Sequence, residues 1–329
     1  MKKLGIALSS GGARGFAHIG ILQEFEKNNI HPDYVTGTSM GAIIGALYCS
    51  GHSAFEIEKL VKSKEWKTAL KIAFPKAGLV KGDEIRNFLK KVLKKNFKEL
   101  NTRFTCIATN VDTGKKVVLN KGDLSKAVYA SMAVPGIFTP LIYKNMVLVD
   151  GGLVEPVPTK QLKEEGIDFI IGVNLTIKGE DESLSSGESF GFGKDFLRHL
   201  RTTWLQEQNK GYRRILYKSK ILESRGFFYR AYEKTLARII RRKKENKRQV
   251  KNPNLLDILT KTMYIMSNQI AVEQIKSKNH NLTIEPKLSS ISLVDEKSIN
   301  ETIEAGRKAA RKIIPKLKEF KRQKPCHQE

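Results

Sequence analysis

The chain has 329 residues, 40% of them hydrophobic, a size that favours one large domain or one domain with an insertion. Its 59 Lys and Arg outnumber its 34 Asp and Glu, which gives a formal net charge of +25. Such a surface attracts polyanions, either nucleic acid or anionic membrane, although charge alone also favours solubility. No apolar run reaches the roughly 18 residues that would indicate a helix crossing a bilayer.

The N-terminal apolar run at 4–8 is followed at once by Ser9-Ser10-Gly11-Gly12. This pattern is more typical of a strand entering a glycine loop than of a secretion signal. The cysteines are odd in number and lack the spacing of a metal site: Cys49, Cys106 and Cys326. We therefore expect a reduced intracellular protein, either cytoplasmic or peripheral at the inner face of the membrane.

Strands and helices alternate over the first 175 residues. In chain order the pattern predicts a strand at 4–9, a helix at 16–28, a strand at 33–38, helices at 40–49, 53–63 and 83–95, strands at 104–109 and 116–119, a short helix opened by 121–123, a strand at 146–149, a helix at 158–165 and a strand at 169–174. This alternation predicts an α/β fold with helices on both faces of a sheet.

The composition changes after the last of these strands. Residues 178–252 contain 20 Lys and Arg against 9 Asp and Glu, a net charge of +11, and are predicted to be mainly helical. After Pro253 we expect a long helix at 255–276, a strand at 282–284 and a terminal helix at 296–320, with Pro315 as its candidate break. We therefore divide the chain into a core at 3–176, a basic insertion at 178–252, a segment at 253–320 that completes the core, and a disordered tail at 321–329.

Residues 37–41, Gly-Thr-Ser-Met-Gly, match the G-x-S-x-G pattern between a predicted strand and a predicted helix. A sharp turn there exposes the Ser39 hydroxyl at a helix N-terminus, where the helix dipole favours negative charge. Larger side chains at Gly37 and Gly41 would clash with this turn. The pattern also arises by chance, but its flanking elements favour a nucleophilic serine.

A second glycine-rich turn, Gly11-Gly12-Ala13-Arg14-Gly15, also lies between a strand and a helix. Its N–H groups can converge on one anion, and one such donor to an oxyanion stabilises a transition state by about 3 kcal/mol. The glycine spacing fits neither a dinucleotide site nor a phosphate-binding loop. Arg14 could instead be a structural arginine that binds nearby carbonyls.

Asp150-Gly151-Gly152 follows a predicted strand, where an aspartate could orient or deprotonate the serine. An Asp-Gly turn is the competing interpretation, and only the other two motifs favour catalysis. No histidine after this aspartate follows a strand, as a triad histidine would: His199, His280 and His327. His18, beside the glycine loop, is more typical of a packed histidine than of a base. A lone aspartate needs a water-poor pocket to raise its pKa from about 3.9.

Together, the glycine loop, the G-x-S-x-G serine and the Asp-Gly-Gly aspartate resemble the patatin-like phospholipase family. The stretch Ala130–Pro140 is similar to a family segment that precedes the aspartate. The resemblance covers 3–176, resumes weakly at about 255–312, and is strongest to bacterial members related to the neuropathy-target-esterase catalytic domain. It implies a three-layer α/β/α sandwich with a mainly parallel sheet, a Ser39–Asp150 dyad without histidine, and an oxyanion hole at Gly11–Arg14.

The resemblance implies a phospholipase A or lysophospholipase-type lipid esterase that forms an acyl-enzyme and needs no metal or organic cofactor. A lipid acyltransferase remains an alternative, as does a catalytically weak regulatory protein that binds anionic membrane or nucleic acid. The chain shows no nucleic-acid-binding motif, so we expect lipid and anionic membrane as partners. In the insertion, an apolar stripe at four-residue spacing fits either an interfacial helix or a packed one: Phe192, Phe196, Leu200 and Trp204.

Overall fold

The computed structural model describes residues 2–70, 82–176, 255–277, 279–288 and 296–322. The predicted insertion at 178–252 and most of the predicted tail lie outside these described residues. Within them, no helix combines the length and the apolar character that crossing a bilayer requires.

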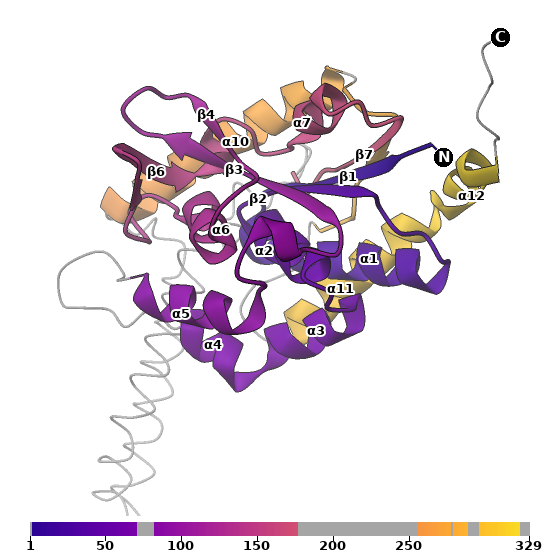
Figure 1. Cartoon of the computed structure of the whole chain (residues 1–329), viewed down its shortest axis with the longest axis horizontal. Coiled ribbons are helices and arrows are strands. Elements are labelled where there is room, and N and C mark those ends of the chain that lie inside the picture. The colour runs from indigo at the N-terminus through magenta and orange to yellow at the C-terminus, as the bar shows by residue number, and fades with distance from the viewer. Residues whose placement is uncertain (1, 71–81, 177–254, 278, 289–295, 323–329) are drawn as a thin grey trace, which may run out of the picture.

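In the described part of the chain, eight strands form one sheet (Figure 1). Their bounds are β1 Leu4–Leu8, β2 Tyr34–Thr38, β3 Arg103–Asn110, β4 Lys116–Leu119, β5 Leu141–Tyr143, β6 Met146–Asp150, β7 Phe169–Val173 and β8 Leu282–Ile284. The order across the sheet is β5-β6-β3-β2-β1-β7-β8, and β4 also pairs with β3. Strands β3, β2, β1, β7 and β8 run parallel, whereas β4, β5 and β6 join by antiparallel pairs. The predicted α/β fold with a mainly parallel sheet is confirmed.

Helices cover both faces of this sheet. They are η1 Gly12–Phe16, α1 Ala17–Lys27, α2 Met40–Cys49, α3 Ala54–Lys62, α4 Lys64–Leu70, α5 Asp83–Val92, η2 Phe97–Glu99, α6 Leu124–Met132, η3 Gly151–Leu153, α7 Thr159–Glu164, α10 Leu255–Lys276, α11 Glu296–Arg311 and α12 Ile314–Arg322. Figure 1 shows α1, α2, α3 and α11 on one side of the central strands and α7 and α10 on the other. The result is the expected three-layer α/β/α sandwich.

The central strand β1 shows why its sequence is continuously apolar. It lies between β2 and β7, and all five of its residues are buried. Ile6 and Leu8 join the large core that contains α1 and α2, whereas Ala7 joins a smaller cluster under α7. A parallel strand buried on both faces needs apolar residues at every position, so its sequence does not alternate.

The C-terminal segment packs on the N-terminal one through two glycines. A Cβ added to Gly20 in α1 would lie 1.9 Å from the carbonyl oxygen of Ile303, and one added to Gly306 in α11 would lie 2.0 Å from that of Ala17. The two helices therefore cross at backbone contact, which only glycine permits at these positions. Strand β8 likewise joins the sheet beside β7.

Four local features differ from the sequence-based expectations. The predicted terminal helix at 296–320 is two helices, and Pro315 lies in the first turn of α12, where proline is tolerated, rather than at the break. Helix α12 also continues through Lys321 and Arg322, two residues into the predicted tail. Helix α4 and strand β5 are not predicted by the sequence pattern. Strand β5 has only three residues, and Lys144 and Asn145, both with positive φ, turn it into β6.

Candidate active site

Ser39 occupies the turn between β2 and α2, with φ of 56° and ψ of −122°. A positive φ is rare for a residue with a side chain and indicates local backbone strain, of a kind that concentrates at functional sites. A Cβ on Gly37 would lie 2.5 Å from the carbonyl oxygen of Gly41, and one on Gly41 would lie 2.1 Å from that of Leu8. Both motif glycines are therefore required by close backbone approach.

Asp150 lies at the end of β6, and its carboxylate reaches the serine. The Ser39 hydroxyl donates to Asp150 Oδ2 at 2.6 Å, and the Gly152 N–H donates to Oδ1 at 2.7 Å. The neighbouring Gly151 is as constrained as Gly37 and Gly41, because a Cβ added to it would lie 2.2 Å from the carbonyl oxygen of Ile107. The structure thus brings together the two residues that the sequence predicted as a dyad.

The environment of Asp150 changes its acidity. Its side chain is 6% exposed. Burial raises the pKa of this carboxyl from 3.8 to about 6, although the hydrogen bonds from Ser39 and Gly152 act in the opposite direction. At neutral pH the group is ionised, yet it is much more basic than an ordinary aspartate. A carboxylate with this pKa is better matched to accepting a proton near pH 7.

Helix α6 and the residue that follows it, Ala133, hydrogen-bond to the backbones of Ser39 and Asp150. The backbone N–H of Ser39 donates to the hydroxyl oxygen of Ser131 at 3.1 Å, and Ser131 is completely buried. Two residues after Ser131, the carbonyl oxygen of Ala133 accepts the backbone N–H of Asp150 at 2.9 Å. The Thr109 hydroxyl donates to the Asp150 carbonyl oxygen at 2.8 Å. No sequence pattern indicated Ser131 as a site residue, although it lies inside the stretch 130–140 that carries the resemblance.

The glycine loop lies directly beside the Ser39 turn. A Cβ added to Gly15 would lie 2.2 Å from Cγ of Met40, the residue after Ser39. The Arg14 N–H donates to the carbonyl oxygen of Gly11 at 3.1 Å, so this predicted oxyanion donor is already engaged. Among the described residues, the N–H groups of Gly11, Gly12 and Ala13 have no acceptor. Those three donors therefore remain the candidates for binding an oxyanion.

The Arg14 side chain extends away from its loop toward α10. It is 4% exposed, and its guanidinium carbon lies 5.2 Å from the ring centre of Tyr264. Burial lowers the pKa of Arg14 to about 10, so it stays charged at neutral pH. Its Nη1 has no hydrogen-bond partner in the described part of the chain. The guanidinium therefore places a buried positive charge against Tyr264 of α10.

His18 supports the glycine loop rather than the serine. Its Nε2 lies 2.9 Å from the carbonyl oxygen of Ser9, which can only accept, so Nε2 carries the proton. Complete burial lowers the pKa of His18 to about 4, which keeps the ring neutral at physiological pH. His280 contacts the Thr283 hydroxyl at 2.7 Å. Two other histidines considered from sequence, His199 and His327, lie outside the described residues.

Part of this chain is similar to a known protein family and to several known proteins. Residues 6–163 match the family model described as patatin-like phospholipase. A protein named lysophospholipase NTE1 from Pyricularia oryzae is 31% identical over 195 residues, which cover 57% of this chain and 13% of that protein. A second lysophospholipase NTE1, from Phaeosphaeria nodorum, is 30% identical over 205 residues, covering 60% of this chain and 14% of its own length.

An uncharacterised NTE family protein of Mycobacterium tuberculosis is 29% identical over 207 residues, which cover 62% of this chain and 54% of that protein. The chain thus spans about an eighth of the fungal relatives and about half of the mycobacterial one. The region shared with the family model contains the glycine loop, Ser39 and Asp150. Residues 6–163 of this chain therefore form a patatin-like phospholipase domain.

Proposed function

We propose that the chain is a lipid acyl-ester hydrolase of the phospholipase A or lysophospholipase type, working through Ser39 and Asp150. The observation that carries this proposal is the 2.6 Å hydrogen bond from the Ser39 hydroxyl to a buried carboxylate with a raised pKa. Membership of the family supports a lipid ester as substrate. The whole relatives are longer than this chain, so their activity enters here only as support.

The proposed reaction begins when the Ser39 oxygen attacks the acyl carbonyl carbon and its proton passes to Asp150 Oδ2. The carbonyl oxygen becomes an oxyanion, which the N–H groups of Gly11, Gly12 and Ala13 receive. Collapse of the tetrahedral intermediate breaks the ester bond. The departing alcohol takes the proton from Asp150, and the acyl group stays on Ser39.

Deacylation reverses these roles with water as the nucleophile. Asp150 accepts a proton from a water molecule that attacks the acyl carbon, and the same loop binds the second oxyanion. Collapse then releases the fatty acid, and the proton returns to Ser39. If another alcohol replaced water in this step, the chain would be an acyltransferase, which the products of the reaction distinguish.

The test is release of fatty acid from phosphatidylcholine and from lysophosphatidylcholine in detergent micelles. We expect the wild type to release free fatty acid and both Ser39→Ala and Asp150→Asn to lose at least about a thousandfold in kcat, as losses of a nucleophile or its base do. Ser125→Ala is the control, because Ser125 is buried like Ser39, but it lies in α6 and its hydroxyl donates to Asp123. An inactive wild type, or a Ser39→Ala variant that keeps its activity, would contradict the proposal.

A further inference from the structure

Helix α10 has one face directed at the candidate active site. Its Ser267 hydroxyl lies 3.4 Å from that of Ser10, at the start of the glycine loop, and its Tyr264 ring contacts Arg14. Further along the helix, Gln274 accepts the backbone N–H of Val157 at 3.0 Å, and Ala271 is 1% exposed. This side of the helix is therefore fixed to the core and touches the site.

In the first half of α10, the opposite face exposes apolar side chains to solvent. Ile258 is 46% exposed, Leu259 48%, Ile265 52% and Met266 52%. Their spacing places them on one side of the helix, turned away from Tyr264, Ser267 and Ala271. Seven large hydrophobic side chains are exposed in the described part of the chain, and four of them belong to this helix. Single exposed apolar residues are ordinary, but a contiguous set indicates an interaction surface.

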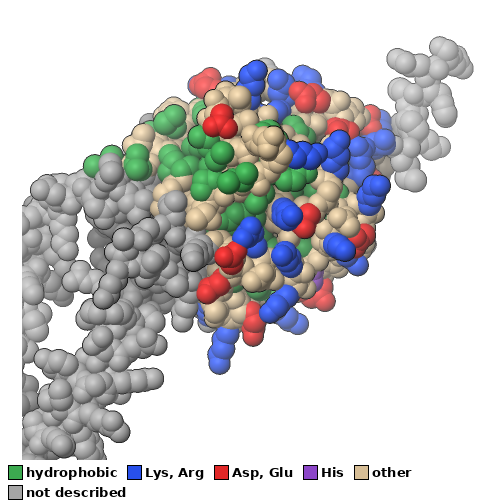
Figure 2. Space-filling model, turned by 60° about the vertical axis from the view of Figure 1, so that its left-hand side comes forward, with side chains coloured by type: hydrophobic (Ala, Val, Ile, Leu, Met, Phe, Trp, Pro, Cys, Tyr) green, Lys and Arg blue, Asp and Glu red, His purple; other side chains and the backbone are tan. Residues whose placement is uncertain are grey.

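The β5–β6 hairpin extends the apolar surface at the same end of the molecule. Ile142 in β5 is 78% exposed, and Val111, whose N–H donates to Val147 in β6, is 53% exposed. Helix η3, which directly follows β6, packs against α10. Figure 2 shows hydrophobic side chains gathered on this side of the molecule. We call the six exposed side chains the apolar face: Val111, Ile142, Ile258, Leu259, Ile265 and Met266.

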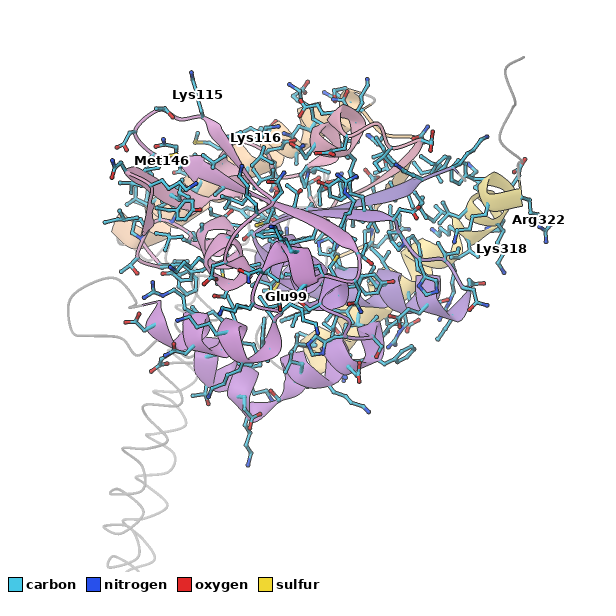
Figure 3. The ribbon with its side chains drawn as sticks, in the orientation of Figure 1. Glu99, Lys115, Lys116, Met146, Lys318 and Arg322 are labelled. Carbon is cyan, nitrogen blue, oxygen red and sulfur yellow. The ribbon has the colours of Figure 1, made fainter. Side chains whose placement is uncertain are left out.

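The charges next to the apolar face are mainly positive. Three lysines are exposed on three connections: Lys115 on the β3–β4 hairpin, Lys121 in the loop after β4, and Lys144 on the β5–β6 hairpin. The Lys115 side chain points away from the protein (Figure 3). Two acidic residues, Asp112 and Asp123, oppose these three lysines on the same connections. In the sequence, residues 178–252, which precede α10, carry a net charge of +11. An apolar surface bordered by cations matches an anionic lipid interface, where acyl chains lie beneath negative headgroups.

We propose that the apolar face docks this chain on an anionic phospholipid bilayer and so places the glycine loop behind α10 next to its lipid substrate. This inference rests on the proposed function, because it names the surface from which the site receives its lipid. The same helix that enters the headgroup region would touch Ser10 and Arg14 with its other face. Membrane contact and access to Ser39 would then depend on one element.

The test compares vesicle binding by three forms of the 329-residue chain that all carry Ser39→Ala, so that hydrolysis cannot remove the lipid. They are the parent, the double variant Ile265→Gln/Met266→Gln, and Phe55→Gln. The control residue Phe55 is 41% exposed on α3, on the other side of the sheet from α10 (Figure 1). Each of the three glutamine substitutions replaces an exposed apolar side chain with a polar, uncharged one, so the net charge of the protein is unchanged. Urea unfolding of each protein checks that the fold is retained.

Co-sedimentation with phosphatidylcholine vesicles, with and without phosphatidylglycerol, is the measurement. We expect the parent to bind the anionic vesicles more tightly and to lose this preference in high salt. The double variant should bind them at least about tenfold more weakly, and Phe55→Gln should bind like the parent. Equal binding by the double variant, or an equal loss in Phe55→Gln, would overturn the proposal.

A second copy of the chain is the competing occupant of the apolar face. Sedimentation velocity without vesicles distinguishes it: a parent dimer that the double variant dissociates would also overturn membrane docking. Because binding is measured in the Ser39→Ala background, an absence of hydrolysis in the wild type would refute the proposed function and leave this result intact.

Discussion

Replacing Asp150 with asparagine should stabilise the protein at neutral pH while it removes activity. Asparagine keeps a similar shape and can still accept the Gly152 N–H, but it carries no charge. Because the native carboxyl has a pKa of about 6 against 3.8 for an ordinary aspartate, the folded state binds a proton that the unfolded state releases between these pH values. The stability of the wild type therefore falls as pH rises through this window.

The size of the effect follows from the shift. About two pKa units at ~1.4 kcal/mol each give roughly 3 kcal/mol of stability lost by the wild type above about pH 6. Asp150→Asn does not have this loss of stability at any pH, because asparagine does not ionise. We expect it to be more stable than the wild type by up to about 3 kcal/mol near pH 8 and by little near pH 4, where the aspartate is also neutral.

Urea unfolding followed by circular dichroism at both pH values measures the difference, and hydrolysis of a soluble ester measures the activity. In the wild type, kcat/KM should rise with pH with a midpoint near 6 and then level off, because the carboxylate is the form that accepts the proton. A stability difference that is the same at both pH values would refute the reasoning, as would a variant less stable than the wild type near pH 8.

Three further changes test other parts of the site. Ser131→Ala leaves the buried N–H of the nucleophile without an acceptor, so kcat should fall about tenfold or more with KM little changed, whereas Ser125→Ala should not alter kcat. Lys116→Met removes the ammonium group that lies 2.7 Å from the Glu155 carboxylate, whose pKa is already raised by burial. Urea unfolding should show that the variant loses about 2 kcal/mol of stability near pH 8 and less near pH 4. The loss stays below the ~3–5 kcal/mol of a fully buried pair, because the Lys116 side chain is 25% exposed. Gly41→Ala would place a Cβ 2.1 Å from a backbone carbonyl oxygen, so it should yield little folded protein in a solubility assay, and normal yield and activity would contradict that contact.

The core elements could be predicted because their patterns are local. Strand β1 is a short apolar run followed by Ser-Ser-Gly-Gly, and α10 and β8 have the bounds that the sequence indicates. Strand β5 could not be predicted, because three residues are too few to show a period and its pairing with β6 depends on a turn at Lys144 and Asn145. The break before α12 was misplaced, since proline fits a first helical turn as well as it ends a helix.

Some residues of the candidate site could be predicted from the sequence, and others could not. Three motifs indicated Ser39, Asp150 and the glycine loop, because each is a short string with a fixed backbone geometry. Ser131 gave no such signal, since its role depends on α6 lying against the turn that holds Ser39. The two residues that make this contact, Ser39 and Ser131, are 92 positions apart in the sequence. Nor does the sequence show that the Arg14 N–H is engaged by Gly11, because this depends on how the loop turns into η1.

Covalent labelling tests the central claim, that Ser39 is a nucleophile activated by Asp150, most directly. The protein is incubated with a long-chain fluorophosphonate, its intact mass is measured, and the modified peptide is sequenced. We predict one adduct per chain on Ser39, none in Ser39→Ala, and slower labelling in Asp150→Asn. An unlabelled wild type, an adduct on another residue, or equal labelling of Ser39→Ala would contradict the claim.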